Sequence, residues 1–497
     1  MPIRSSSRRK AERRRHLLLR LLVPVLVLAL ALPGLAASPW RVGTDPTYAP
    51  FEMQESKSGE LKGFDIELIK AIARRSGHRV VFTALPFDGL IPALQARSVD
   101  LAISAMTITA SRAETVDFSR PYFAAGLGIV VRDGTDDINT LRDLRGRTIA
   151  VQIGSVGAKA MAAVPGAKLS TFDSAPLALQ ELINGHVDAY VNDLPATRYA
   201  INTIGLRGIR IAGKPLTEDY YGVAFPMDSP LRPTVNRVLD QLIADGSYAR
   251  LHQRWFGTLP PPLPEQAPAL ANRDRQAQLD PGQLVNNLGH GALITLSLTL
   301  SSFGLGLFAA AFLAAGLLCR QSVVRRSCRF YVEFFRGTPL LVQLFMIYFG
   351  LPALAQALGH TVSFNRFAAA VVALSLNAAA YLAETLRSGI ASIDKGQWEA
   401  ARALGLGPLP TLRCVIVPQM LQLVLPSLAN ACITLSKDTS LAAVIGFEEL
   451  FREGQLLVAT SYRAFEVYLA VALVYLLLTA LISLLFRRWE AQLAQPA

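Results

Sequence analysis

The C-terminal half of the chain contains long stretches without a charged side chain, and these limit its possible folds more than any other feature. Five such stretches stand out, at residues 291–318, 337–358, 367–383, 414–436 and 467–486. Crossing the hydrocarbon core of a membrane takes about 20 apolar residues in a helix, because a helix satisfies its own backbone hydrogen bonds where water is absent. The sequence therefore predicts an all-α membrane domain of five transmembrane helices, the third of them completed beyond Glu384.

The composition agrees with a membrane part, since 52% of the 497 residues are hydrophobic and only 17% are charged. The net charge of +12 arises largely at the N-terminus, where eight basic residues and one acid, Glu12, accompany an apolar run. This pattern is typical of a targeting segment rather than of a nucleic-acid surface. We expect residues 1–37 to be a signal peptide or a signal anchor, and either one would export the region from residue 38 onward.

The charges between the apolar stretches predict which ends face the cytoplasm. Residues 319–329 carry four arginines and no acid, whereas residues 437–466 carry five acids and three bases. Positively charged loops stay on the cytoplasmic side. The first loop, the loop around Glu399 and the C-terminal tail are therefore expected in the cytoplasm, and the region before the first stretch outside it.

Residues 38–257 have a different pattern. Short Val/Ile/Leu runs such as "VVFTAL" and "TIAVQ" alternate with helix-like stretches such as "DIELIKAIARRSG", which predicts an α/β domain with a largely parallel sheet. Residues 258–283 are rich in proline and charge, a composition that favours a semi-rigid linker. The sequence thus predicts an α/β domain tethered to a membrane domain.

A polar loop between the third and fourth apolar stretches has a recognisable spacing. It begins "GQWEAARALG" and returns to the membrane at "PLPTLRCVIVP". This spelling resembles the EAA loop of ABC-importer permeases, with the motif at Glu399, Ala400, Ala401 and Gly405 inside a coupling loop at 393–412. The resemblance implies a coupling helix that docks into a groove of a separate ATPase subunit.

The resemblance to these permeases covers residues 284–490, and "YVEFFRGTPLLVQLFMIYFGLP" is similar to their polar amino acid branch. It implies a multi-pass protein of the bacterial cytoplasmic (inner) membrane that forms a homodimer, unless a second permease subunit exists. The chain has no GxxxxGK[ST] sequence, so we expect ATP to be used by the partner ATPase and no cofactor on this chain. Glu384 and Arg387 are expected to form an ion pair.

The segments "VGTDPTYAPFE", "GFDIELIKAIA", "ISAMTITASRAETVDFSRPY" and "GHVDAYVND" resemble extracytoplasmic amino-acid-binding proteins. This resemblance implies a two-lobed α/β fold of the type II periplasmic-binding-protein class. The first lobe would take residues 38–126 and 224–257, and the second residues 127–223, with crossovers near 126–131 and 221–225. Closure of the lobes around a ligand would present it to the permease.

The same resemblance implies where the two charged groups of an amino acid bind. Arg112 would clamp the α-carboxylate with two hydrogen bonds, helped by Ala105 and Thr107. Asp193 and Ser104 would take the α-ammonium. Both charges of a zwitterion would then be matched inside a desolvated cleft, which is what makes burying them tolerable.

Five further residues are implied around the rest of the ligand. Ser155 would add donors to the carboxylate from the second lobe, and Tyr48 and Phe87 would flank the side chain. Asp45 and Gln152 would meet its far end. Because a carboxylate attracts cations and accepts hydrogen bonds, Asp45 fits a basic or amide side chain. The predicted function is import of polar amino acids, with basic amino acids or glutamine favoured.

Two other classes of protein fit the sequence less well. An amino-acid-gated receptor or channel could combine a binding domain with membrane helices, but its pore usually interrupts the binding domain. An enzyme is the other class, yet the six histidines are scattered and neither HExxH nor GxSxG occurs. All four cysteines lie in the apolar half, so neither a disulfide framework nor a metal site is expected.

Overall fold

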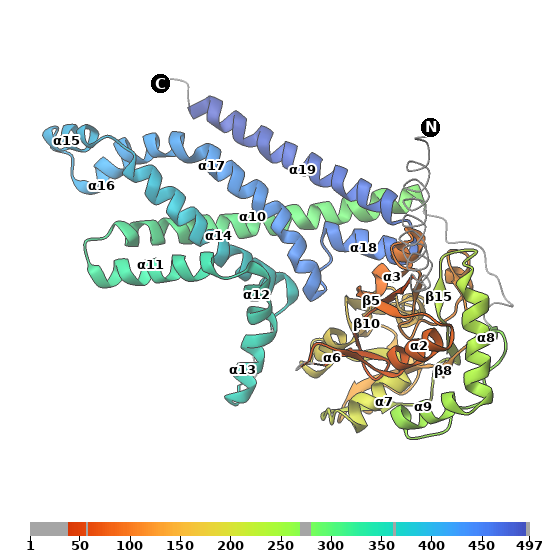
Figure 1. Ribbon diagram of the computed structural model, residues 1–497. Coiled ribbons are helices and arrows are strands. Elements are labelled where there is room, and N and C mark those ends of the chain that lie inside the picture. The colour runs from red at the N-terminus through yellow and green to blue at the C-terminus, as the bar shows by residue number, and fades with distance from the viewer. Residues whose placement is uncertain (1–37, 56–57, 269–279, 361–363, 494–497) are drawn as a thin grey trace, which may run out of the picture.

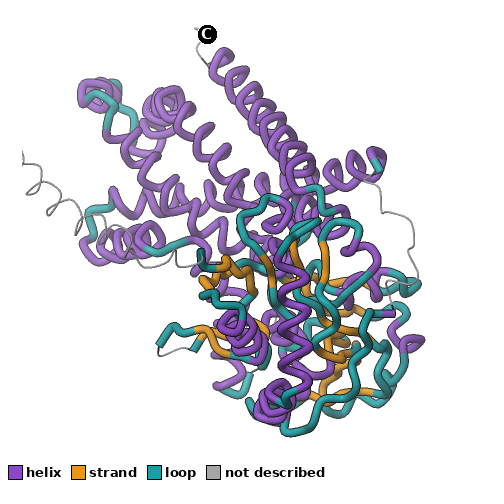
Figure 2. Tube along the Cα trace, turned by 45° about the vertical axis from the view of Figure 1, so that its right-hand side comes forward, coloured by secondary structure: helices purple, strands orange, loops and turns teal. Residues whose placement is uncertain are grey.

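The computed structural model describes residues 38–55, 58–268, 280–360 and 364–493. The predicted signal segment lies outside the described residues, as does the middle of the predicted linker. Among the described residues, the strands gather in the N-terminal part of the chain and the C-terminal part is helical (Figures 1 and 2). The predicted combination of a two-lobed α/β domain and a helical domain is confirmed.

The first lobe is built on a sheet with the strand order β5-β1-β6-β15-β7. Its strands are β1 (Trp40–Thr44), β5 (Val80–Ala84), β6 (Leu101–Ala102), β7 (Asp117–Phe118) and β15 (Ala224–Phe225). β1 runs parallel to β5 and β6, and β15 runs antiparallel to β6 and β7. A small sheet, β2 (Thr47–Tyr48), β3 (Glu52–Gln54) and β4 (Leu61–Lys62), lies in the same lobe.

The second lobe is built on a sheet with the order β11-β10-β12-β9-β13. Its strands are β9 (Leu127–Arg132), β10 (Thr148–Gln152), β11 (Lys168–Phe172), β12 (Ala189–Asp193) and β13 (Ile209–Ala212). β10 runs parallel to β11 and β12, whereas β9 runs antiparallel to β12 and β13. Both sheets are therefore mixed, with three parallel neighbouring strands on one side, β5-β1-β6 in the first and β11-β10-β12 in the second, which agrees with the predicted largely parallel sheet.

Helices cover both sheets because their apolar residues recur at helical spacing. In α2 (Phe64–Arg75), Leu68, Ile69 and Ile72 are buried against the first sheet. The other helices of the two lobes are η1 (Phe87–Gly89), α3 (Leu90–Gln95), α4 (Ala110–Ala113), η2 (Leu141–Leu144), α5 (Val156–Ala162), α6 (Ala175–Ile183), α7 (Leu194–Asn202), α8 (Leu231–Ala244) and α9 (Ser247–Phe256).

The chain passes between the lobes along two adjacent segments. β8 (Phe123–Ala125) pairs antiparallel with β14 (Asp219–Tyr221), next to both predicted crossovers. Gly126 follows β8, and a Cβ added there would lie 2.2 Å from the carbonyl oxygen of Thr217. Only glycine therefore allows the two connecting segments to approach so closely. This pair of strands is the hinge about which the lobes can open.

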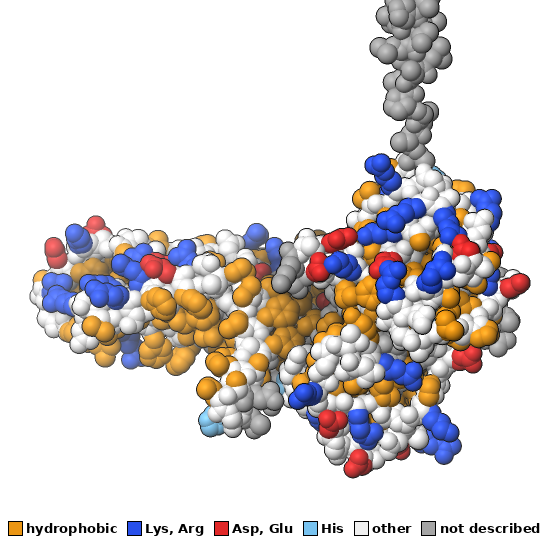
Figure 3. Space-filling view, turned by 60° about the horizontal axis from the view of Figure 1, so that its bottom comes forward, with side chains coloured by type: hydrophobic (Ala, Val, Ile, Leu, Met, Phe, Trp, Pro, Cys, Tyr) orange, Lys and Arg blue, Asp and Glu red, His pale blue; other side chains and the backbone are white. Residues whose placement is uncertain are grey.

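Among the described residues, four helices are long and apolar enough to cross a membrane. They lie in α10 (Pro281–Leu318), α14 (Arg366–Ala391), α17 (Val417–Asp438) and α19 (Ala464–Leu493). They agree with the first, third, fourth and fifth predicted spans. Their surface carries exposed leucine and phenylalanine side chains (Figure 3), which suits a helix bundle that faces lipid.

The second predicted span is bent. α11 (Ser322–Gly337) is followed by α12 (Leu340–Phe345), which continues through η4 (Met346–Gly350) and α13 (Leu351–Ala357). The two parts meet at an angle of 105°, so five spans are reached only if this bent pair counts as one. Pro339 explains the break, since proline cannot continue a helix and disfavours helical geometry in the residue before it.

The helical domain has two different ends (Figure 1). α15 (Lys395–Ala403) and α16 (Pro408–Thr411) form one end, and the π-helical η5 (Leu412–Ile416) leads from there into α17. The α/β domain lies at the other end, beside α18 (Leu450–Ser461) and near η6 (Thr439–Ile445). The coupling loop and the α/β domain are thus separated by the length of the membrane helices.

Candidate amino-acid-binding cleft

The two lobes meet at a cleft that encloses a cavity of about 20 Å³. The structure brings together all of the residues predicted to contact an amino acid, and each of them lines this cavity: Asp45, Tyr48, Phe87, Ser104, Ala105, Thr107 and Arg112 from the first lobe, and Gln152, Ser155 and Asp193 from the second. The role of each residue toward a ligand stays a prediction.

The folds of the two sheets explain why these residues meet. Asp45 directly follows β1 and Ser104 lies two residues after β6, while Gln152 ends β10 and Asp193 ends β12. These strands are parallel within each lobe. Parallel strands end at the same edge of a sheet, where open α/β proteins place their ligands. Because a polar residue lies at or just after the end of a strand in each lobe, both lobes contribute polar side chains to the cleft.

Direct hydrogen bonds cross the cleft and hold the lobes together. The Tyr48 hydroxyl lies 3.0 Å from Oδ1 of Asn192 and 3.1 Å from Oδ2 of Asp193. Gln152 Nε2 donates to Oδ2 of Asp45 at 3.1 Å. Each of these contacts joins one residue of the first lobe to one of the second, so the described state of the α/β domain is closed.

Arg112 is a buried cation, 3% exposed, that lines the cleft cavity. Its guanidinium donates to the carbonyl oxygens of Thr107 at 2.7 Å and of Gly154 at 2.9 Å, and lies 5.3 Å from the centre of the Phe87 ring. Within the described part of the chain, no carboxylate lies at ion-pair distance from it. A buried cation with neutral neighbours is suited to bind an anionic group.

Asp193 provides the opposite charge on the second lobe. Its Oδ2 accepts hydrogen bonds from Tyr221 at 2.6 Å and from Tyr48 at 3.1 Å. Burial raises the pKa of Asp193 to about 6, although both tyrosine hydroxyls lower it in part. Near neutral pH the carboxylate is ionised and suited to hold an ammonium group.

Asp45 and Gln152 meet each other across the cleft and both line the cavity. Asp45 is 3% exposed and accepts a hydrogen bond from the Thr47 hydroxyl at 2.7 Å. Burial raises its pKa, and the hydrogen bonds from Thr47 and Gln152 oppose this rise. The pair presents one carboxylate and one amide to the cavity, and their contact with the far end of a ligand stays a prediction.

A buried pair of acids beneath the cleft was not predicted. The Ser104 hydroxyl donates to Glu52 at 2.8 Å, and the Ala105 N–H donates to Asp65 at 2.8 Å. The Tyr122 hydroxyl also donates to Asp65, at 2.6 Å. Burial raises the pKa values of Glu52 and Asp65, that of Asp65 to about 6. These acids position the Ser104–Ala105 segment, and the Ala105 N–H is already engaged by Asp65.

The cavity has other lining residues that were not proposed as ligand contacts. They are Leu127, Val156, Gly157 and Asn192. Asn192 could have been recognised because it directly precedes Asp193. Glu52 and Asp65 stand in the segments "PFE" and "GFDI", but nothing in those segments shows that the two side chains converge.

Comparison with known proteins decides the family. Residues 40–258 match the bacterial extracellular solute-binding proteins, family 3, and residues 302–495 match the binding-protein-dependent transport system inner membrane component. The L-cystine transport system permease protein TcyL of Bacillus subtilis is 40% identical over 202 residues, which are 40% of this chain and 82% of that protein. The chain belongs to the amino-acid ABC transporter permeases.

One further curated relative agrees with this assignment. The glutamine transport system permease protein GlnP of Escherichia coli is 44% identical over 163 residues, which are 33% of this chain and 73% of that protein. Among solved structures, an ancestral arginine-binding protein bound to arginine is 40% identical over 45% of this chain and all of that chain, with a TM-score of 0.43.

This amino-acid ABC transporter permease therefore carries a solute-binding domain on the same polypeptide. It is a transporter subunit and not an enzyme, and its family implies an ATPase partner and an amino acid ligand. The relatives give no support to an amino-acid-gated receptor or channel.

The predicted ATPase-coupling residues lie on and after α15. Glu399 and Ala400 are exposed, Ala401 is buried against the neighbouring helices, and Gly405 adopts a φ of 77° that ends the helix turn. Glu399 and Ala400 are therefore accessible to another subunit. Their contact with an ATPase stays a prediction.

Replacing Arg112 by alanine is expected to weaken binding of the best-bound amino acid by about 3 kcal/mol, roughly 150-fold, because a buried carboxylate would lose its partner. Calorimetric titration of the purified full chain measures the change. Arg142→Ala, which removes an exposed arginine of the second lobe, is the matched control and should leave affinity unchanged. Equal affinities of the Arg112→Ala and native chains would contradict the assigned role.

The pKa of Asp193 predicts a pH dependence of binding. Protonation removes the charge that attracts the ammonium group, so affinity should fall roughly tenfold per pH unit as pH drops below about 6. In Asp193→Asn, affinity should be low and nearly constant over the same range, while Asp133→Asn on the exposed surface should behave as the native chain. If the affinity of the native chain stays constant down to about pH 4, Asp193 does not bind the ammonium group.

Proposed function

We propose that the chain captures a polar amino acid outside the bacterial cytoplasmic membrane and passes it inward, driven by ATP hydrolysis on a partner subunit. The observation that carries this proposal is the closed cleft, in which one small cavity is lined by the carboxylate of Asp193 and by Arg112, which has no ion-pair partner among the described residues. One cation and one anion in a desolvated cleft are complementary to a zwitterion and to few other small molecules.

The favoured cargo is a basic amino acid or glutamine. Asp45 at the far side of the cavity supports a side chain that carries positive charge or N–H donors. The neighbouring Gln152 amide suits an amide or guanidinium group as well. Relatives of the permease half are named for two different amino acids, L-cystine and glutamine. The choice of cargo therefore rests on the residues of the cleft and not on the permease half.

The separation of the two ends supports the proposed orientation. The α/β domain and α15 lie at opposite ends of the helices (Figure 1), and an importer needs its receptor outside and its ATPase inside. The arginines Arg325, Arg326 and Arg329 lie on α11 in the first half of that helix, and they favour a cytoplasmic location for that helix end.

An open cavity of about 1270 Å³ between α14, α17 and α12 supports a homodimer. Polar side chains line it, among them Asn377, Asp438 and the ion pair of Glu384 with Arg387. Charged groups at membrane depth are costly when they face lipid. A second permease half would cover them and complete a pathway, which also fits the symmetry of most oligomers.

The test combines binding with uptake. The purified full chain is titrated with each of the twenty amino acids, and cells that carry the native gene are then compared with deletion cells for accumulation of the amino acids that bind. The proposal predicts that one or a few polar amino acids bind at micromolar or tighter affinity and that their ATP-dependent uptake is lost on deletion. Absence of binding by all twenty would refute it.

Asp45→Asn provides a separate test of selectivity. Removal of the negative charge should weaken L-arginine or L-lysine binding roughly tenfold or more, while L-glutamine binding should change by less than about threefold. Calorimetry with the three amino acids measures both effects on one variant. Equal losses for all three would place Asp45 outside the selectivity site.

A further inference from the structure

The second lobe of the binding domain rests on the permease domain through three permease side chains. Tyr348, Arg366 and Arg452 each bond to residues of that lobe. They come from η4, the start of α14 and α18, which are far apart in sequence. Gly446 completes the contact, because a Cβ there would lie 2.7 Å from the carbonyl oxygen of Thr171.

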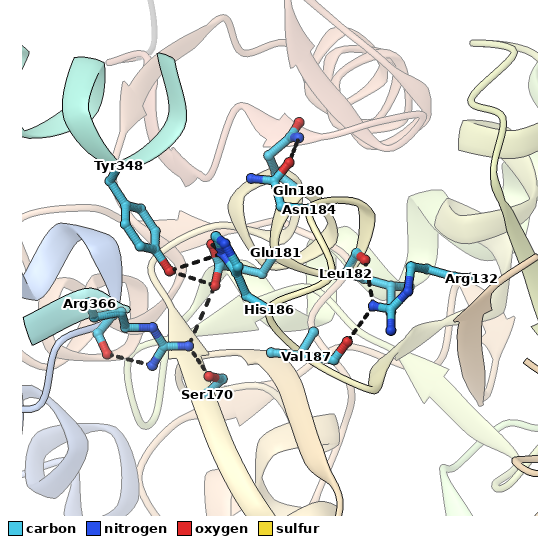
Figure 4. A network of polar contacts seen from close by, with 11 residues as sticks. Arg132, Ser170, Gln180, Glu181, Leu182, Asn184, His186, Val187, Tyr348 and Arg366 are labelled. Atoms are coloured by element: carbon cyan, nitrogen blue, oxygen red, sulfur yellow. Dashed lines mark hydrogen bonds and ion pairs between the residues drawn. The ribbon is translucent and has the colours of Figure 1, made fainter. Parts of the chain in front are cut away.

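Tyr348 and Arg366 hold the lobe at a buried acid (Figure 4). The Tyr348 hydroxyl donates to Glu181 at 2.8 Å, and the Arg366 guanidinium lies 3.6 Å from the same carboxylate. Arg366 also donates to the Ser170 hydroxyl and lies 5.0 Å from the centre of the Phe172 ring. Glu181 is fully buried, whereas the Arg366 side chain is 20% exposed, so the acid of this ion pair is desolvated and its partner only in part.

Arg452 makes the second contact, close to the ligand cavity. It is fully buried on α18, and its guanidinium donates to the Asp173 carboxylate and to the Thr171 hydroxyl at 3.1 Å. These two partners belong to the binding domain, and a third acceptor, Oε1 of Gln455 at 3.0 Å, lies on α18 itself. A buried guanidinium loses its hydration, so its position depends on its acceptors, two of which the second lobe supplies.

Asp173 links Arg452 to the cavity. The backbone carbonyl of Asp173 accepts a hydrogen bond from Gln152 Nε2 at 3.3 Å, and the same amide donates to Asp45 at 3.1 Å. Gln152 and Asp45 both line the cavity. A continuous row of contacts thus runs from a permease helix to the far end of the ligand site.

α18 also contacts the first lobe on the other side of the cleft. Its end, at Ala459 and Tyr462, lines a small space together with Phe87, Arg112 and Gly154. Phe87 and Arg112 belong to the first lobe and Gly154 to the second. α18 therefore lies across the cleft, and its complete set of partners exists only when the two lobes are closed.

We propose that α18 senses closure of the cleft, and that Arg452 is the positioning residue through which the ligand site acts on the permease. Closure brings the Asp173 carboxylate and the Phe87 region to α18 together, whereas opening separates them. Because α18 touches both lobes, a movement of this helix during transport would in turn open the cleft and release the amino acid. Reciprocity of this kind is required of any coupling between two sites. The proposal rests on the proposed function.

The test uses the full chain with L-arginine and L-glutamine as probes. Binding is measured by calorimetry on the purified protein, and uptake is measured in cells in which each variant replaces the native gene. Arg452→Gln and Asp173→Asn should lower uptake at least tenfold, within the usual range of allosteric coupling, and should weaken binding by a smaller factor, because the lost contact also stabilises the closed cleft. Arg463→Gln, which removes an exposed arginine soon after α18, is the matched control and should transport normally.

The double variant separates coupling from a general structural role. If Arg452 and Asp173 act as one contact, Arg452→Gln with Asp173→Asn should transport no worse than either single variant, and Arg452→Lys should keep part of the activity. If Arg452→Gln does not reach the membrane, the full chain with Asp173→Asn, a substitution in the binding domain, provides the test.

The outcomes are distinct. Native-like uptake in both single variants would overturn the role of Arg452, and so would a loss of binding equal to the loss of uptake. A native chain that neither binds nor accumulates any amino acid would instead refute the proposed function.

Discussion

The structure depends on an arginine that is buried without an acidic partner among the described residues. Arg112 bonds to backbone carbonyls from both lobes, at Thr107 and Gly154, and so its cationic charge is positioned but not neutralised. Placing such a group in a cleft is costly unless an anion joins it. Asp193 has the complementary property on the opposite lobe, and the hinge of β8 and β14 brings the two together. The cleft is therefore organised around the two charges of an amino acid.

The membrane domain connects to this cleft without any intervening subunit. α18 and the start of α14 contact the closed binding domain, while α15 presents Glu399 and Ala400 at the opposite end. Covalent fusion keeps the receptor at a high effective concentration near these contacts. A ligand signal that begins at Asp45 can thus reach a permease helix through Gln152, Asp173 and Arg452 alone.

Much of this architecture could be predicted from the sequence because it depends on patterns of residues that are close together in the chain. Charge-free stretches indicated four of the membrane helices, and the resemblance to amino-acid-binding proteins implied that Arg112 and Asp193 lie in one cleft. The bend at Pro339 was missed because the apolar run continues across it, so hydropathy alone registers one span. α18 was missed because its segment carries charges that resemble a solvated loop. The contacts of Arg452 with Asp173 and of Tyr348 with Glu181 join residues more than 160 positions apart, and no local pattern specifies such pairs.

The central claim is that one cleft binds both charged ends of an amino acid, and calorimetric titration of the full chain tests it. The three ligands are its tightest-binding amino acid, the amine that lacks the carboxylate, and the acid that lacks the ammonium. We expect each analogue to bind at least about 100-fold more weakly than the amino acid, because each leaves Arg112 or Asp193 buried without its partner. Binding of either analogue as tight as that of the amino acid would show that the cleft does not recognise both charges.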